Sequence, residues 1–341
     1  MISIFELLIG IIFILFTAMV FCNALEHLGE HLGISDGVTG SIFVAVGTAL
    51  PETIVPLIAL FGGNVTDAND IGIGAIMGPP LMLSTLSVAL MAVSVFKSRG
   101  LNGMIRPEKT GLKRDLRFFA FGYIMAILLA FSHNFYQNHL VDVGIVILLV
   151  SSYLLYVLLT MRASRGLVAS GHATEAEDEL LLHKYLRLPS NLYTVLLQSL
   201  LGFIGLIYFA HIFINGITGT SQLLGIPAFL LSLVLIPVAT ELPEKVNSIL
   251  WIRKGKDTLA MGNITGAMVF QGLLLPVAGI LLTDWTLPLA HAVSCVATLL
   301  ATAWMYSHIV GVRNQLKVKH FIVNAILYIC SLIISLMVFH V

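Results

Sequence analysis

Long apolar segments separated by short polar ones dominate the chain. Ten segments each hold roughly the 20 apolar residues that a helix needs to cross the hydrocarbon core of a bilayer. They cover residues 3–23, 38–62, 71–97, 115–133, 139–161, 191–219, 226–251, 258–283, 286–308 and 318–340. The pattern predicts an all-α integral membrane protein with ten transmembrane helices.

Basic residues orient these helices. The predicted loops after the third, fifth, seventh and ninth helices contain clusters of Lys and Arg. All four loops lie on one side of a ten-helix arrangement, and Lys and Arg accumulate in cytoplasmic loops. We therefore expect a multi-pass protein of the inner or plasma membrane, with both termini on the extracytoplasmic side.

One sizeable polar segment, residues 162–190, divides the chain. It separates five predicted helices in residues 1–161 from five in residues 191–341, and we expect a cytoplasmic linker there. Because five is odd, the second half enters the membrane from the side opposite the first. A repeat shared by the halves then has inverted topology, as in many secondary transporters.

The halves do share a repeat. Residues 45–52 read AVGTALPE and residues 237–244 read PVATELPE. A second pair of matching stretches follows, GAIMGP at 74–79 and GNITGA at 262–267. Agreement of Thr, Leu, Pro and Glu at fixed offsets in two apolar segments indicates a five-plus-five internal repeat.

Composition narrows the classes of function. Hydrophobic residues make up 58% of the chain and charged residues 11%, against about 25% charged residues in a soluble domain. The mean hydropathy is +0.97. The formal net charge is zero, so the composition does not indicate a basic surface that would bind nucleic acid. The expected partners are metal cations and the lipid bilayer, and the sequence leaves the oligomeric state open.

Glu52 and Glu244 lie near the middle of the second and seventh predicted helices. An ionised side chain in that position costs about 2.5–3.5 kcal/mol on insertion scales. Each carboxylate therefore needs a partner. We assign no Lys or Arg to the central part of any predicted helix, which leaves a proton or a metal cation. A protonated Glu that is hydrogen-bonded inside a helix bundle is the alternative.

The neighbours of each Glu favour a cation. Thr48 and Thr240 each precede the Glu of their repeat by four residues, so each pair shares a helix face. We also expect Pro51 and Pro243 to break their helices, since a proline frees a backbone carbonyl one turn earlier. Carboxylate, hydroxyl and carbonyl oxygens are the ligands that hard cations such as Ca²⁺ and Na⁺ prefer.

The segments GTALPE and VATELPE, each followed by a stretch with glycines, resemble the two α-repeats of the sodium/calcium exchanger (Ca²⁺/cation antiporter) superfamily. The resemblance implies a transporter rather than an enzyme, with Ca²⁺ and Na⁺ or H⁺ as cargo and no resident cofactor. It also implies that Glu52 and Glu244 are the central ligands and that Thr48 and Thr240 add hydroxyl or carbonyl oxygens. The carbonyls of Ala45 and Pro237 would serve an outer Na⁺ site.

The chain resembles a divergent member of this superfamily. Where the family usually carries Ser and then Asn or Asp, the chain has Pro79 and Leu83 in one half and Ala267 and Gln271 in the other. The Ser that commonly follows the Thr is replaced by Glu241 in the second half. Glu241 and Gln271 are therefore candidate ligands. The alternatives are a solvated vestibule for Glu241 and an interhelical hydrogen bond for Gln271.

We expect an antiporter that exchanges Ca²⁺ for Na⁺ or H⁺ by alternating access, with the first and sixth helices moving past the others. An exchanger of the same fold for Mg²⁺, Mn²⁺ or K⁺, and a cation channel, stay open. A zinc enzyme is a further alternative, because His27, Glu30 and His31 fit the H-x-x-E-H pattern in a predicted loop. His211 and His291 are proton carriers or core histidines.

Overall fold

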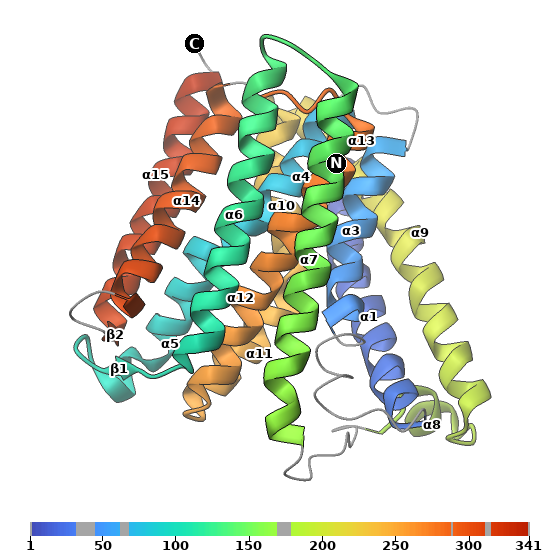
Figure 1. The fold of residues 1–341 in the computed structure, drawn as a ribbon. Helices are drawn as coiled ribbons and strands as arrows, with labels where there is room; N and C mark the ends of the chain where they lie inside the picture. The colour runs from blue at the N-terminus through green and yellow to red at the C-terminus, as the bar shows by residue number, and fades with distance from the viewer. Residues whose placement is uncertain are drawn as a thin grey trace. The chain divides into compact units, whose positions relative to one another are not determined.

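The computed structural model describes residues 2–31, 45–61, 68–168, 179–287, 289–310 and 315–339. Side chains at some positions inside these ranges lie outside the description, among them those of Ala45, Thr48 and Glu244. Nearly all described residues are helical, and Figure 1 draws the helices in chain order from blue to red.

Seven of the predicted transmembrane segments are single helices where they are described. These helices are α1 (Ile2–His31), α3 (Ala45–Phe61), α6 (Lys109–His133), α7 (His139–Val168), α9 (Leu192–Leu224), α14 (Leu289–Val310) and α15 (Phe321–Phe339). Residues 38–44, which the sequence assigns to the second segment, lie outside the described residues.

The other three segments are built from shorter pieces. The third contains α4 (Ala68–Met82), a π-helical turn η2 (Leu83–Ser87) and α5 (Val88–Arg99). The seventh contains α10 (Ala228–Thr240) and α11 (Leu242–Arg253), and the eighth contains α12 (Asp257–Leu273) and α13 (Leu275–Leu282). A proline stands in the first turn of both α11 and α13, where its missing N–H has no intrahelical partner to lose.

The predicted helix break is therefore confirmed in one repeat only. At Pro243 the chain ends α10 and begins α11. At Pro51 it does not break, because α3 continues through both Pro51 and Pro56. A membrane helix tolerates an internal proline when neighbouring groups satisfy the freed carbonyl.

Length and composition make these helices a membrane domain. Among the described residues, eight helical stretches are long and apolar enough to cross a bilayer. Pro51–Phe61 and Ala228–Thr240 are two shorter apolar helices. The ten match the predicted segments in order, which confirms an all-α, multi-pass membrane protein.

The helices divide into two compact units. The first unit contains residues Met1–Thr66 and Leu155–Gly225, and the second contains Asp67–Leu154 and Ile226–Val341. Each unit takes helices from both halves of the sequence. The division into repeats 1–161 and 191–341 rests on the sequence pattern and stays a prediction.

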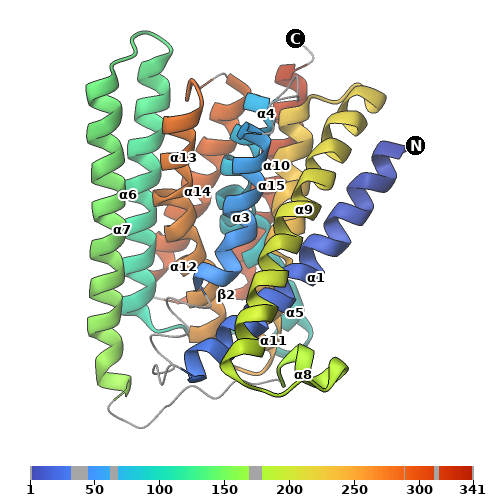
Figure 2. The ribbon, with the colours of Figure 1, turned by 90° about the vertical axis from the view of Figure 1, so that its right-hand side faces the viewer.

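In the first unit, α1 packs closely along α9, and α3 contacts both (Figure 2). Glycines permit this close approach. A Cβ added to Gly10 would lie 2.6 Å from the Phe213 Cβ, and one added to Gly202 would lie 2.9 Å from the Phe21 Cα. At one end of the pair, the Gln198 Nε2 donates hydrogen bonds to the Val20 carbonyl (3.0 Å) and the Asn23 Oδ1 (2.8 Å).

In the second unit, α4 packs against α10 through the glycines of the first repeat. A Cβ on Gly74 would lie 2.8 Å from the Phe229 carbonyl oxygen. A Cβ on Gly78 would overlap the Leu233 carbonyl oxygen and lie 2.6 Å from the Pro237 Cγ. The backbone of α10, which leads to the second repeat, is therefore held against α4 at a distance that only glycine allows.

We expect Gly78→Ala to destabilise the protein by about 1–3 kcal/mol, the usual cost of overpacking. The obstacle is backbone rather than a flexible side chain, so the helices must separate. Thermal unfolding of the purified protein in detergent measures the effect. Gly262→Ala, at the position that matches Gly74 in the second repeat, is the control, because its Cβ would meet no atom within 4 Å. Equal unfolding temperatures for the two variants would contradict the prediction.

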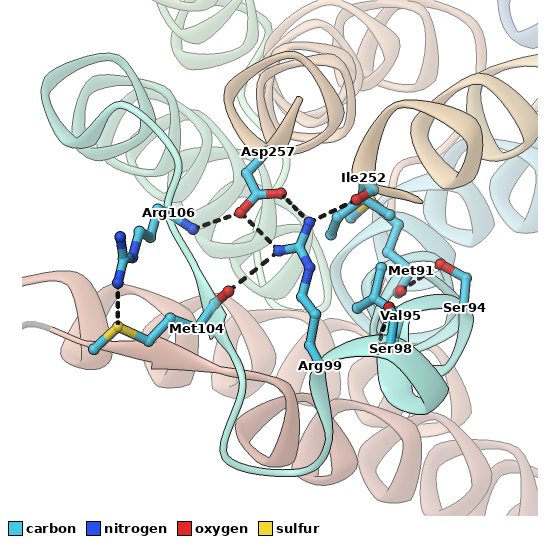
Figure 3. A network of polar contacts seen from close by, with 9 residues as sticks. All are labelled: Met91, Ser94, Val95, Ser98, Arg99, Met104, Arg106, Ile252 and Asp257. Atoms are coloured by element: carbon cyan, nitrogen blue, oxygen red, sulfur yellow. Dashed lines mark hydrogen bonds and ion pairs between the residues drawn. The ribbon is translucent and has the colours of Figure 1, made fainter. Parts of the chain in front are cut away.

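An ion-pair network joins the loop after α5 to the start of α12 (Figure 3). The Arg99 Nη1 and Nη2 donate to the two Asp257 carboxylate oxygens at 2.8 Å each, and the Arg106 N–H donates to the Asp257 Oδ2 at 2.8 Å. Beside it, β1 (Met104–Ile105) pairs antiparallel with β2 (Leu316–Lys317). The strand pairing ties the segment before α6 to the segment before α15, and the ion pairs tie it to α12.

Candidate ion-binding site

The junction of α10 and α11 places Glu241 between two helices. Its backbone has φ −98° and ψ 3°, in the sparsely occupied bridge region where many active-site residues sit. The Glu241 N–H donates to the Pro237 carbonyl (3.1 Å), and the Glu241 carbonyl accepts from the Lys245 N–H (3.1 Å). The two helices thus remain linked by hydrogen bonds across the residue whose side chain carries charge.

The Glu241 side chain lies in a buried polar cluster. The residue is 0% exposed. Its Oε1 accepts a hydrogen bond from the Gln271 Nε2 of α12 (3.1 Å), and its Oε2 lies 3.3 Å from the Lys245 Nζ. The structure therefore brings together two sequence candidates, Glu241 and Gln271. In this structure Glu241 does not face a solvated vestibule, since none of it is exposed.

Lys245 is the residue that the sequence analysis overlooked. It is 6% exposed, and its Nζ donates to the Pro237 carbonyl at 3.0 Å and contacts the Met82 Sδ. The sequence analysis assigned no Lys or Arg to the central part of a predicted helix, but Lys245 lies within the seventh one and is a basic partner of Glu241. The signal was present, because a Lys inside a predicted transmembrane segment is rare and calls for a partner.

The structure describes the other candidates of the second repeat only in part. Thr240 is 1% exposed, and its Oγ1 donates to the Ile236 carbonyl of the preceding turn (3.0 Å). Glu244 belongs to the first turn of α11, and its side chain lies outside the description. The Gln271 Oε1 is buried and has no hydrogen-bond partner among the described residues.

Glu52 of the first repeat lies on α3 and is 2% exposed. The predicted burial of this carboxyl group is therefore confirmed. Ala45 is the first residue of α3, and Thr48 lies one turn before Glu52, with both side chains outside the description. These three residues belong to the first unit, and the Glu241 cluster belongs to the second.

The predicted loop of the zinc pattern is part of a helix. His27 and His31 lie in the last turns of α1, where His27 is 8% exposed and His31 is exposed. In the part of the chain that the structure describes, no three His, Cys, Asp or Glu side chains are placed to hold a metal. His211 is exposed, and the ring of the buried His291 packs on Phe229 with 3.9 Å between centroids.

Curated relatives match most of the chain. The inner membrane protein YrbG of Escherichia coli K12 is 23% identical over 292 residues, which are 84% of this chain and 82% of the relative. The sodium/calcium exchanger MaX1 of Methanosarcina acetivorans is 22% identical over 339 residues, which cover 87% of this chain and 91% of the relative. The similarity thus extends well beyond the repeat motifs.

Solved structures show the same fold. The crystal structure of the H⁺/Ca²⁺ exchanger CAX aligns with a TM-score of 0.71 at 17% identity, over 98% of this chain and 87% of that chain. The sodium-calcium exchanger NCX_Mj aligns with a TM-score of 0.57 at 19% identity, over 97% of this chain and 98% of that chain. At this identity the likeness establishes the fold alone.

Family membership rests on a match along nearly the whole chain. Residues 2–162 and 194–337 match the family described as sodium/calcium exchanger protein. That match covers both candidate repeats and includes at least part of every described helix except α8 (Leu181–Leu186). Because the family consists of transporters, the match rules against the zinc-enzyme alternative. The chain therefore belongs to the sodium/calcium exchanger protein family, as a multi-pass membrane antiporter of cations and not an enzyme.

Proposed function

We propose that the protein exchanges Ca²⁺ for Na⁺ or H⁺ by alternating access, with Glu52 and Glu244 as its central cation ligands. The observation that carries the proposal is the burial of Glu52, 2% exposed on a membrane helix. The repeat places Glu244 at the equivalent position of the second half. Thr48, Thr240 and the Ala45 carbonyl supply further oxygens, whereas the Pro237 carbonyl, the remaining candidate, already accepts a hydrogen bond from Lys245.

The charge of these carboxylates explains why the protein would exchange ions rather than leak them. A site filled by Ca²⁺, or by its counter-ions, is neutralised and can change between inward-facing and outward-facing states. An empty site retains uncompensated charge in a medium of low dielectric constant, which raises its free energy. The close pair α1 and α9 is the moving element that we propose, since these are the first and sixth predicted helices.

The ligand set bears on the choice between Na⁺ and H⁺ as the driving ion. The Pro237 carbonyl accepts a hydrogen bond from the Lys245 Nζ, and the family's Ser and Asn or Asp positions carry apolar residues or Gln. Both features lower the number of oxygens available to Na⁺. They favour H⁺ as the counter-ion, and similar proteins include exchangers named for each ion.

Flux measurements in proteoliposomes separate the alternatives. Uptake of radiolabelled Ca²⁺ is measured under an imposed Na⁺ gradient and, separately, under a pH gradient. The gradient that drives uptake identifies the counter-ion. Competition by Mg²⁺, Mn²⁺ or K⁺ tests an exchanger of the same fold for another cation. A cation channel gives no counterflow in sealed vesicles, whereas an antiporter accumulates label against unlabelled Ca²⁺ inside.

We expect Glu244→Gln to abolish gradient-driven Ca²⁺ uptake while the protein still inserts and purifies as wild type. The amide keeps the size of the side chain and removes the charge that binds the cation. Glu179→Gln is the control, because Glu179 is exposed in the segment before α8. Wild-type uptake by Glu244→Gln would exclude Glu244 as a central ligand.

A further inference from the structure

We propose that the Lys245 ammonium is a built-in cation of this site: it occupies the position between Pro237 and Glu241 that would otherwise bind a monovalent metal ion from solution. The inference deepens the proposed function and rests on it. It concerns the second unit alone, since Met82, Pro237, Glu241 and Lys245 all belong to that unit.

The contacts of Lys245 match those of an ammonium group. Three acceptors surround its Nζ: the Pro237 carbonyl at 3.0 Å, the Glu241 Oε2 at 3.3 Å and the Met82 Sδ. An ammonium group has three N–H donors and no acceptor. Each donor thus has an acceptor, and the side chain is 93% shielded from solvent, with a relative exposure of 7%.

Two of these acceptors are the oxygens that a small cation would seek. Sodium binds carboxylate and carbonyl oxygens, as other hard cations do. The Pro237 carbonyl is a candidate cation ligand in the proposed function, and the Lys245 Nζ donates to it in the structure. The positive charge of the Lys245 side chain thus takes the place of a metal cation from solution.

Among the described side chains of the cluster, the charges of Glu241 and Lys245 balance each other. Glu241 contributes one negative charge, Lys245 one positive charge, and Gln271, which donates to the Glu241 Oε1, contributes none. A further monovalent cation placed here would meet the ammonium at close range and be repelled. The transport cycle would accordingly bind one monovalent ion fewer than a chain with a neutral residue at position 245.

A purely structural ion pair makes a different prediction. In that case, removal of Lys245 lowers stability and creates no binding site, because the cluster repacks around Glu241. If the ammonium replaces a metal ion, its removal leaves the Glu241 carboxylate and the Pro237 carbonyl ready to bind one. The number of bound Na⁺ ions distinguishes the two, whereas stability does not.

The experiment counts Na⁺ bound to Lys245→Met. Equilibrium dialysis with radiolabelled Na⁺, on protein purified in detergent without Ca²⁺, gives ions bound per chain. We expect Lys245→Met to bind one Na⁺ more than wild type. The double variant Glu241→Gln with Lys245→Met is the matched control, because it removes both charges. We expect its count to return to that of wild type, since Glu52 and Glu244 are unchanged in all three proteins.

An unchanged Na⁺ count in folded Lys245→Met would overturn the inference. If the variant is unstable, its melting temperature is compared in sodium chloride and in N-methyl-D-glucamine chloride at equal ionic strength. The inference requires a larger stabilisation by Na⁺ in Lys245→Met than in the double variant, and equal shifts would overturn it. So would a single variant that unfolds in both salts while the double variant folds.

The outcome is separable from the test of the proposed function. Na⁺ binding in detergent requires no transport, so it reports on Lys245 even if Ca²⁺ exchange fails. Conversely, loss of Ca²⁺ uptake in Glu244→Gln supports the proposed function whatever the Na⁺ count of Lys245→Met.

Discussion

Glu52→Gln is expected to abolish gradient-driven Ca²⁺ exchange and to leave the protein folded in the membrane. Glu52 is 2% exposed on α3. Loss of an outer-shell partner of a metal ligand costs roughly 10–100-fold in affinity or activity, and loss of a ligand charge should exceed that range. Because the amide is neutral, it carries no cost of burying a charge, so stability should not fall. Radiolabelled Ca²⁺ uptake and size-exclusion chromatography measure the two quantities.

The control for Glu52→Gln is again Glu179→Gln, with Glu52→Asp as a second comparison. Asp keeps the charge and shortens the side chain by one carbon, so partial uptake is expected at raised Ca²⁺ concentrations. Uptake at the wild-type rate in Glu52→Gln would contradict the assignment of Glu52 as a central cation ligand. Loss of uptake together with aggregation would assign Glu52 to folding instead.

Asp257→Ala is expected to destabilise the protein by about 3–5 kcal/mol, the cost of removing one partner of a buried ion pair. The side chains of Arg99 and Asp257 are 21% and 8% exposed, which places the effect toward the lower end of that range. Asp257 accepts from Arg99 through both carboxylate oxygens and from the Arg106 N–H (Figure 3). Thermal unfolding in detergent measures the loss.

Two comparison proteins test the cause of this loss. Asp284 is exposed, so Asp284→Ala should unfold at nearly the wild-type temperature. Joint replacement of Arg99 and Asp257 by Leu removes both charges. It should destabilise less than Asp257→Ala, which leaves the Arg99 guanidinium without its carboxylate. A double variant less stable than Asp257→Ala would contradict the ion-pair explanation.

The sequence predicted the membrane segments well, because their physical basis is local. A bilayer requires about 20 apolar residues per helix, and that requirement is visible in any stretch such as 139–161. The effect of proline was predicted less well. Pro243 begins a new helix and Pro51 lies inside one, although the two occupy equivalent positions. Whether a helix continues past proline depends on the groups packed around the freed carbonyl.

The candidate site was predictable in part. The four-residue spacing of Glu241 and Lys245 predicts a contact on one helix face, and the structure shows it even though α11 begins between them. The contributions of Gln271 and Met82 come from α12 and α4, which are distant in sequence. No spacing rule brings such residues together. Lys245 is not marked by the repeat, because the residue after Glu52 in the first half is Thr53.

The composition of the two units constrains how the chain is made. The first unit needs residues up to Gly225 and the second needs residues up to Val341. When the ribosome has finished the first half, neither unit has all its helices, and the face of α1 that packs against the glycines of α9 has not yet met that helix. Helices synthesised early must therefore rest in the lipid as separate, stable spans until much later ones arrive. Because helices from both halves of the sequence contribute to each unit, the units can assemble only after their helices have been inserted into the membrane.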